Sequence, residues 1–389
     1  MVRMSLARPI AAVILLGALF SGARGEEERP PPTTRGSPGA APPAEVTRAQ
    51  LDAIAKGLTY LASEQSKVDG SFNEEPAANI AVTSLAVLAF MANGHTMNRG
   101  RHSDSVARGV DFLLRHVTSP AAATGERPSG YICLDADEQS RMHGHGYAAL
   151  ALALAYGSSE PRPGSDGRAE REEIREKLAR AVAVIERSQD ETGGWWYYPV
   201  RLGTTSHEGS VTVCMVQALR MAREAGIPVR KEVIDRAVNY LERSQDPTSG
   251  GFCYSLTTRD RQTYALTAAA LSTLFGLGEY GRDRMVKAGL EFMDDHFEAS
   301  FFGYEGWFFY GNLYAAQALW QAAAVQKFEP HWKRWWPRMR DHLVDDQRTG
   351  GYWPERGAVS TTGTSSAFAT ACAVLILSVP LQLLPLFQR

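Results

Sequence analysis

The sequence lacks several patterns that would point directly to a known kind of site. Its four cysteines stand far apart in 389 residues, so no Cys-x-x-Cys pair is available for a zinc ribbon or a thioredoxin-type redox centre. The formal net charge of -2 provides no basic field for nucleic acid. Neither a Gly-x-Ser-x-Gly elbow nor a glycine-rich phosphate loop occurs. These absences argue against thiol redox chemistry, nucleic-acid binding and serine-hydrolase chemistry.

The N-terminal part of the chain differs in composition from the rest. Residues 1–25 begin with arginines, continue with an apolar run over residues 10–20 and end on small residues, as an export signal does. We expect cleavage near residues 24–26 and a periplasmic or secreted protein, with an uncleaved anchor as the alternative. Residues 26–45 hold six of the 20 prolines and no large apolar residue, which predicts a disordered linker.

The remaining residues, 46–389, contain an internal repeat. Residues 180–190 and 236–246 agree at eight of eleven positions, at an offset of 56. Each copy ends in Gln-Asp and is followed by a glycine pair and an aromatic residue. A third version runs from Gln347 to Tyr352. The repeat therefore predicts one domain built from similar units.

Two kinds of helix alternate between these turns. Charged helices with a single apolar stripe, typical of a protein surface, are expected near residues 47–64, 101–117, 168–189, 230–245, 281–297 and 331–346. Ala-rich helices that are apolar on nearly every side, typical of a buried position, are expected near residues 77–93, 142–157, 207–225, 260–277, 311–327 and 362–379. Short links make neighbours antiparallel, so six such hairpins predict two concentric rings. The last Ala-rich helix is too short to cross a membrane, and we expect no transmembrane helix in the mature chain.

The repeat resembles that of terpenoid cyclases and protein prenyltransferase β subunits, because Gln, a nearby acid, a glycine pair and an aromatic residue follow one another. The resemblance covers essentially all of residues 46–389 and implies an all-α fold, the α/α toroid. In that fold a ligand cavity opens at one end of the inner barrel. The starts of the inner helices and the turns before them would line it, with the ligand-binding candidates Tyr147, Trp196, Tyr198, His207, Glu208, Tyr254, Tyr304, Trp307, Tyr310, Asn312 and Tyr314.

The aromatic content of this set predicts the class of ligand. Aromatic walls suit an apolar chain and can stabilise a carbocation through ring quadrupoles. The resemblance therefore implies a polyprenyl-type ligand that is bound and, if the protein is an enzyme, cyclised or transferred. No cofactor or metal is expected. Cys253-Tyr254-Ser255 resembles the zinc-binding stretch of prenyltransferases, but Gly251 stands where those proteins have their Asp ligand.

A catalytic acid is implied by resemblance to class II terpenoid cyclases, which protonate their substrate with an Asp-x-Asp-Asp motif. The nearest stretch is Asp135-Ala136-Asp137-Glu138, ahead of a helix that carries two further catalytic candidates, His143 and His145. Asp137 would be the acid, with Asp135 and Glu138 beside it. Glu138 departs from the motif, and the second helical domain of those cyclases has no counterpart in this chain.

Two other functions remain open from the sequence. A non-catalytic toroid could bind an apolar ligand or an unknown protein partner as a scaffold. A glycan-active enzyme with the same double barrel would need two carboxylates facing each other across its cavity, and the candidates are Glu208, Glu305 and Asp260.

Overall fold

The computed structural model describes residues 45–74, 77–134, 140–158, 167–199, 207–279, 281–302, 307–355 and 365–388. The predicted export signal and all but the last residue of the predicted linker lie outside these ranges. The helices described below belong to the unit formed by residues 33–389. Within the described ranges, no helix combines the length and the apolar character needed to cross a membrane.

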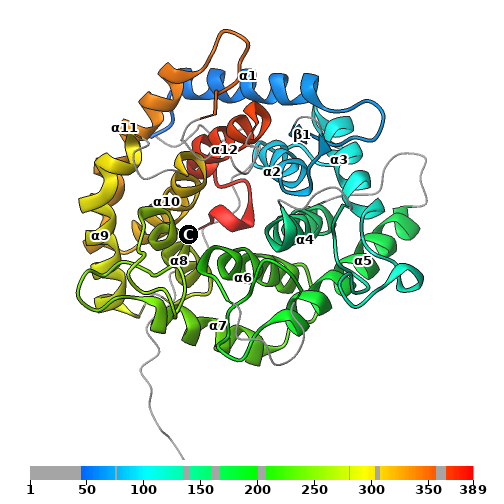
Figure 1. Cartoon of the computed structure of the whole chain (residues 1–389). Coiled ribbons are helices and arrows are strands. Elements are labelled where there is room, and N and C mark those ends of the chain that lie inside the picture. Colours follow the sequence, from blue (N-terminus) through cyan, green and yellow to red (C-terminus); the bar gives the residue numbers. More distant parts are fainter. Residues whose placement is uncertain are drawn as a thin grey trace, which may run out of the picture. The chain divides into compact units, whose positions relative to one another are not determined.

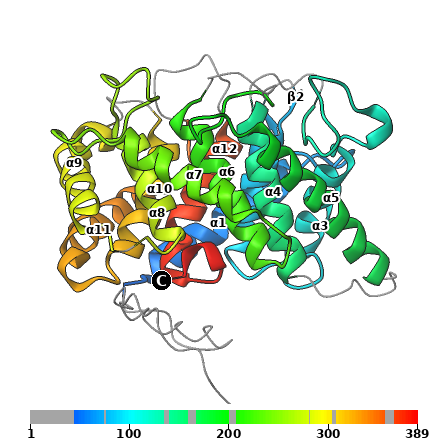
Figure 2. The same ribbon diagram turned by 90° about the horizontal axis from the view of Figure 1, so that it is seen from below.

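The described ranges contain twelve α-helices that alternate between an outer and an inner ring (Figures 1 and 2). The outer helices are α1 (Arg48–Glu64), α3 (Ser103–Arg115), α5 (Gly167–Ser188), α7 (Lys231–Ser244), α9 (Asp283–Phe301) and α11 (Glu329–Asp346). The inner helices are α2 (Ile80–Met91), α4 (Arg141–Ser158), α6 (Gly209–Glu224), α8 (Tyr264–Gly276), α10 (Phe308–Ala322) and α12 (Ser366–Ser378). The predicted α/α toroid is confirmed.

Little other regular structure accompanies the helices. Two strands of two residues each, β1 (Asn73–Glu74) and β2 (Ala77–Ala78), pair antiparallel. Short 3-10 turns are η1 (Pro120–Ala122), η2 (Gln326–Phe328), η4 (Val379–Leu381) and η5 (Pro385–Phe387). The prediction that no substantial sheet forms therefore holds for the described part of the chain.

The inner ring closes on itself because the inner helices are apolar on nearly every side. Figure 1 shows α2 beside α4, and the ring continues through α6, α8, α10 and α12 back to α2. In α4, residues 148–153 are all almost completely buried. Their Ala and Leu side chains let the helix pack against two inner neighbours and against the outer helices α3 and α5. The prediction that this Ala-rich segment lies in the inner ring is confirmed.

The outer helices bury one stripe and expose the rest. In α7, Ile234, Ala237 and Leu241 are buried, whereas Lys231 and Asp235 form an exposed ion pair. Short links from inner to outer helices begin with a glycine in the left-handed backbone region. An example is Gly226, which has φ of 86° just after α6. Neighbouring helices therefore run antiparallel, and the starts of all inner helices lie at one end of the barrel (Figure 2).

The repeat turns join each outer helix to the next inner helix. Gln189 Nε2 donates to the carbonyls of Gly193 and Val233, both at 2.9 Å, and so ties its own turn to α7. The side chains of Gln65, Gln245 and Gln347 make the same pair of bonds at 2.8–2.9 Å. Gly193 has φ of 94°, and a Cβ there would lie 2.2 Å from the Arg236 carbonyl oxygen, which explains the glycine.

The aromatic residue of each turn anchors the next inner helix. Trp195 is fully buried, its indole Nε1 donates to the Ile185 carbonyl at 2.7 Å, and its backbone N–H donates to Thr212 Oγ1 at 3.1 Å. Trp353 repeats both bonds with Leu343 and Thr370. The motif predicted from sequence is thus a structural joint between rings.

Candidate functional site

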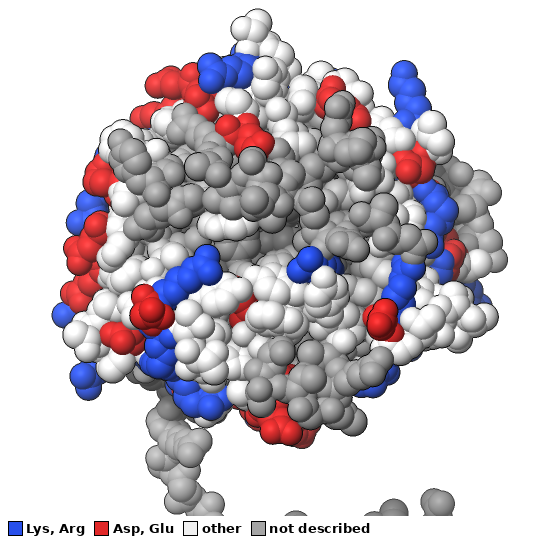
Figure 3. Space-filling view, in the orientation of Figure 1, with Lys and Arg blue, Asp and Glu red and all other residues white. Residues whose placement is uncertain are grey.

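The mouth of the barrel is the end at which the inner helices start. Figure 3 looks onto this face, where both basic and acidic side chains of the described residues are visible. Some of the predicted residues lie outside the described part of the chain: Asp135, Asp137, Glu138, Tyr304 and Glu305. The remaining candidates and their neighbours form the described part of the site.

A chain of hydrogen bonds connects the starts of α4 and α6. His143 Nε2 lies 2.8 Å from Ser210 Oγ, and Ser210 Oγ donates to Glu208 Oε2 at 2.6 Å. Glu208 is the N-cap of α6 and also accepts the Val211 N–H at 2.9 Å. Its side chain is buried, with 1% of the residue exposed. We call His143, Ser210 and Glu208 the mouth array.

Burial decides the charge state of the array. Desolvation raises the pKa of Glu208, although the hydrogen bonds from Ser210 and Val211 act in the opposite direction. Desolvation, with the nearby Arg141, lowers the pKa of His143 to about 4. The histidine is therefore neutral near pH 7. Because the single Ser210 proton goes to Glu208, His143 must donate from Nε2, which leaves Nδ1 as a proton acceptor without a partner among the described residues.

Aromatic rings and arginines surround the array. The Tyr197 ring lies 5.6 Å from the His143 ring, and its hydroxyl is 2.9 Å from that of Tyr254. The Arg141 guanidinium lies 4.7 Å from the centre of the Tyr198 ring, and Arg261 lies 4.5 Å from the centre of the Tyr254 ring. Two positive charges therefore stand on aromatic faces, and Arg261 acts electrostatically on Glu208 whereas Arg141 acts on His143.

Sequence reasoning missed several members of this group: Ser210, Tyr197, Arg141 and Arg261. Tyr197 lies in the aromatic run from Trp195 to Tyr198, so ring content alone could have included it. Ser210 follows Glu208 by two residues at a helix start, which is a weak signal. Its contact with His143 joins residues 67 positions apart, and only the closed ring brings them together.

The tyrosines predicted to line an open cavity form the floor of the mouth instead. The hydroxyls of Tyr147 and Tyr314 are 3.1 Å apart, Cys214 Sγ lies 3.5 Å from the Tyr314 hydroxyl, and the Tyr310 and Tyr314 rings are in edge contact. Burial raises the pKa of all three tyrosines well above the usual value. Asn312 is fully buried and donates to a carbonyl of its own helix.

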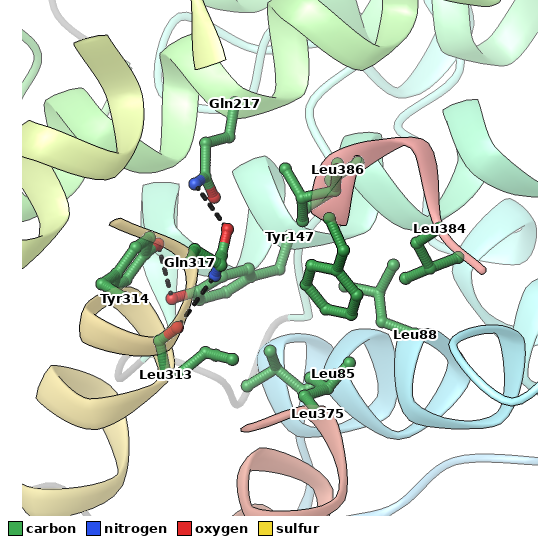
Figure 4. Close-up of a pocket in the computed structure, with 12 residues that line it drawn as sticks. Leu85, Leu88, Tyr147, Gln217, Leu313, Tyr314, Gln317, Leu375, Leu384 and Leu386 are labelled. Atoms are coloured by element: carbon green, nitrogen blue, oxygen red, sulfur yellow. Dashed lines mark hydrogen bonds between the residues drawn. The ribbon is translucent and has the colours of Figure 1, made fainter. Parts of the chain in front are cut away.

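The described residues below this floor enclose a small cavity. It has a volume of about 10 Å³ between the tyrosines and the C-terminal residues, which is room for about one water molecule. Figure 4 shows Gln217 donating to Gln317 at its edge, at a distance of 3.2 Å. Between these described residues the cavity has no room for an elongated ligand.

Two predicted histidines have structural partners. His145 accepts the Ile132 N–H on Nδ1 at 3.1 Å and donates from Nε2 to the Ala181 carbonyl at 3.2 Å, so both nitrogens are used inside the protein. Its pKa is lowered by burial to about 4. His207 Nδ1 lies 3.2 Å from the Tyr240 hydroxyl of α7. Both ring nitrogens of His145 are therefore occupied within the protein, and His207 contacts α7; the catalytic role of His145 and the ligand role of His207 stay predictions.

Exposed rings border the mouth. Trp307 is 41% exposed and directly precedes α10, and Tyr198 is 48% exposed. Trp196 is half-buried and lies in edge contact with Tyr197. Phe302, the last described residue before 303–306, is 60% exposed. Apolar surface of this kind is available to a ligand at the mouth.

Two residues considered for other chemistries, Cys253 and Asp260, lie shortly before α8. Cys253 is buried with its sulfur 3.2 Å from the Arg259 carbonyl oxygen, and burial raises its pKa, so it is a thiol rather than a metal-binding thiolate. Asp260 is exposed; of the other two carboxylates considered with it, Glu208 belongs to the mouth array and Glu305 lies outside the described residues. Among the described residues, no group of three or more His, Cys, Asp or Glu side chains could hold a metal ion.

Comparison with known proteins gives matches in structure only. No family model matches the chain, and neither does any curated protein. The structure of a D-mannose isomerase matches with a TM-score of 0.59 and 12% identity, over 87% of this chain and 99% of that one. A glycoside hydrolase of family 76, a mannosidase from Bacteroides thetaiotaomicron, matches with a TM-score of 0.58 and 10% identity, over 85% and 98% of the two chains.

A type II terpene cyclase from Scytonema matches with a TM-score of 0.54 and 15% identity, over 86% of this chain and 98% of that one. Identities this low show a common fold and leave the activity open. The repeat and the three-dimensional likeness agree on the same point. The chain is an α/α toroid that resembles a type II terpene cyclase as well as enzymes that act on sugars.

Proposed function

We propose that the protein binds an elongated apolar ligand of the polyprenyl type at the mouth of the barrel, with a polar head group on the mouth array. The hydrogen-bond chain of His143, Ser210 and Glu208 is the observation that supports this best. It leaves His143 Nδ1 as an acceptor among aromatic rings, where it can bind a hydroxyl of the head group.

The likeness to a terpene cyclase supports the ligand class. That cyclase was solved with geranylgeranyl dihydroxybenzoate, a polyprenyl chain on a hydroxylated ring. In this chain the apolar part would lie against Tyr198 and Trp307, because these rings are exposed, whereas the cavity beside Tyr147 and Tyr314 is too small to hold it. Covering them removes apolar surface from water, which is favourable.

The experiment is to extract the purified, full-length protein with organic solvent and identify retained lipids by mass spectrometry. Geranylgeraniol binding is then measured by calorimetry for wild type, His143→Ala and Lys231→Ala. Loss of the head-group contact should weaken binding about tenfold in His143→Ala, which corresponds to about 1.4 kcal/mol. Lys231→Ala is the matched control, because Lys231 is exposed on the outer ring.

The lipid analysis and the binding measurements distinguish a lipid-binding protein from a scaffold without a lipid ligand. If wild type retains no lipid and does not bind geranylgeraniol, the ligand class is wrong. Equal binding by wild type and His143→Ala would show that the array takes no part. A sugar ligand is the outcome to examine next, since two of the matched structures are of sugar-acting enzymes by their names.

We also propose that the protein is exported after cleavage near residues 24–26. The supporting observation is the order of arginines, apolar run and small residues over positions 1–25. N-terminal sequencing of the protein from its native cells tests this. An intact N-terminus in a membrane fraction would identify an anchor instead.

A further inference from the structure

The last described residues lie inside the barrel, at the end opposite the mouth. After α12, residues 379–388 turn back between the inner helices, as the red segment at the centre of Figure 1 shows. We call these residues the C-terminal segment. Leu384, Leu386 and Phe387 are buried there, whereas Leu383 of the same segment is 47% exposed.

The walls around this segment are apolar. Figure 4 shows Leu384 and Leu386 near leucines of the inner helices, with the Tyr147–Tyr314 pair on another side. The wall leucines come from α2, α4, α10 and α12: Leu85, Leu88, Leu150, Leu313 and Leu375. If the segment left, these side chains would face water, so another apolar chain could take its place.

The segment is attached less completely than the helices around it. Trp320 Nε1 donates to the Phe387 carbonyl at 2.9 Å, and Gln321 Nε2 donates to the Leu386 carbonyl at 3.3 Å. Gln321 Oε1 is buried without a partner among the described residues, and the cavity of about 10 Å³ lies beside Leu386 and Phe387. An unpaired buried oxygen is unfavourable. The segment contributes no residue to the twelve described α-helices, so a displacement of residues 383–388 would remove none of them.

We infer that this end of the barrel is a binding chamber for a linear apolar chain, and that the C-terminal segment occupies it in the unliganded protein. The chamber is separate from the mouth array, since the paired tyrosines lie between them. The inference therefore goes beyond the proposed function and does not depend on it. An apolar chain would bind by displacing Leu384, Leu386 and Phe387 from the leucine walls.

The test uses N-phenyl-1-naphthylamine, a neutral apolar probe that fluoresces when it leaves water. Two changes should open the chamber: a chain that ends at Gln382, and the full-length variant Phe387→Ala. The control is Leu383→Ala, which alters an exposed side chain of the same segment. We expect the shortened chain to bind one probe molecule at least tenfold more tightly than wild type, and Phe387→Ala to lie between the two. Leu383→Ala should match wild type.

Two further measurements test whether the probe binds in the chamber. A peptide with the sequence of residues 383–389 should displace the probe from the shortened chain, as should farnesol. Combining the shortened chain with His143→Ala should leave probe binding unchanged, because His143 belongs to the mouth.

Two results would overturn the inference. One is a shortened chain that keeps its helical circular dichroism and gains no probe binding. The other is a shortened chain that unfolds while Phe387→Ala binds the probe no better than Leu383→Ala. The second result would identify the segment as an ordinary part of the core.

Discussion

The repeat turns and the mouth array lie at the same end of the barrel but are built in different ways. In five turns, the backbone N–H of one residue donates to a side chain of the next inner helix at 2.9–3.1 Å. The pairs are Phe72 with Thr83, Ile132 with His145, Trp195 with Thr212, Phe252 with Thr267, and Trp353 with Thr370. Among the described residues, the bond from His143 to Ser210 has no such counterpart in the other repeats. A hydrogen bond that recurs in several repeats helps to hold the rings together. A hydrogen bond that is found once is a candidate for function.

His145 shows why this distinction matters. From the sequence it stood beside His143 as a second catalytic candidate. In the structure it takes the place that threonine has in four other turns, as the acceptor for a turn N–H. Glu208 belongs to both groups, because it caps α6 as Asn79 caps α2 but also binds Ser210.

The largest loss of stability is expected from a substitution in a repeat turn. Trp195→Ala removes a fully buried indole and its bond to the Ile185 carbonyl. We expect a loss of about 3–5 kcal/mol in the free energy of unfolding, measured by urea denaturation. Tyr198→Ala, at an exposed ring three residues later, is the control. Equal losses in the two variants would contradict a special role for the turn.

Acid should lower the free energy of unfolding because of His145. The folded ring has a pKa of about 4, below the usual 6.5, so the unfolded chain takes up a proton that the folded protein does not. Stability should therefore fall as pH drops from about 6.5 to 4, by up to about 3 kcal/mol from this residue, and level off below that. The raised pKa of Glu208 acts in the opposite sense, because protonation of its carboxyl is easier in the folded state.

His145→Thr isolates the contribution of His145. Threonine is the residue at this place in the other turns and does not titrate, so the variant should lose less stability between pH 6.5 and 4 than wild type. Urea denaturation across this range measures the difference. Parallel curves for the two proteins would show that the His145 ring does not titrate in this window.

A smaller loss of stability is expected from a substitution in the mouth array. Ser210→Ala removes the donor to Glu208 and the acceptor of His143, at a cost of about 0.5–1.5 kcal/mol. Nitrogen NMR of the His143 ring should show the proton on Nε2 in wild type and a mixture of tautomers in the variant. A single unchanged tautomer would mean that Ser210 does not set the state of the ring. Ser249→Ala, at an exposed serine of a repeat turn, is the control.

The smallest effect on stability is expected at the rim of the mouth. Trp307 is 41% exposed, so Trp307→Ala should change the free energy of unfolding by no more than about 0.5 kcal/mol. The same variant should bind geranylgeraniol more weakly than wild type in calorimetry. A large loss of stability with unchanged binding would place Trp307 among the packing residues.

Most of the helical architecture could be predicted because its signals are local and repeated. The Ala-rich segments predicted inner helices, and Gln and Gly at fixed spacing predicted the turns. The site could be predicted only in part. Ring content drew attention to the starts of α4, α6 and α10, but it could not separate the exposed Trp307 from the buried Tyr314. Trp307 caps α10 and Tyr314 lies within it, and they differ in exposure through what the other parts of the chain place beside them.

The sequence by itself determined that this chain forms alternating buried and exposed helices joined by repeated turns. The reason is that periodicity and glycine placement act over a few residues, whatever the rest of the chain does. The tertiary structure decided which polar residues meet and what fills the barrel. His143 and Ser210 come together, and the C-terminal segment enters the barrel, only when six inner helices close into a ring and bring distant residues together.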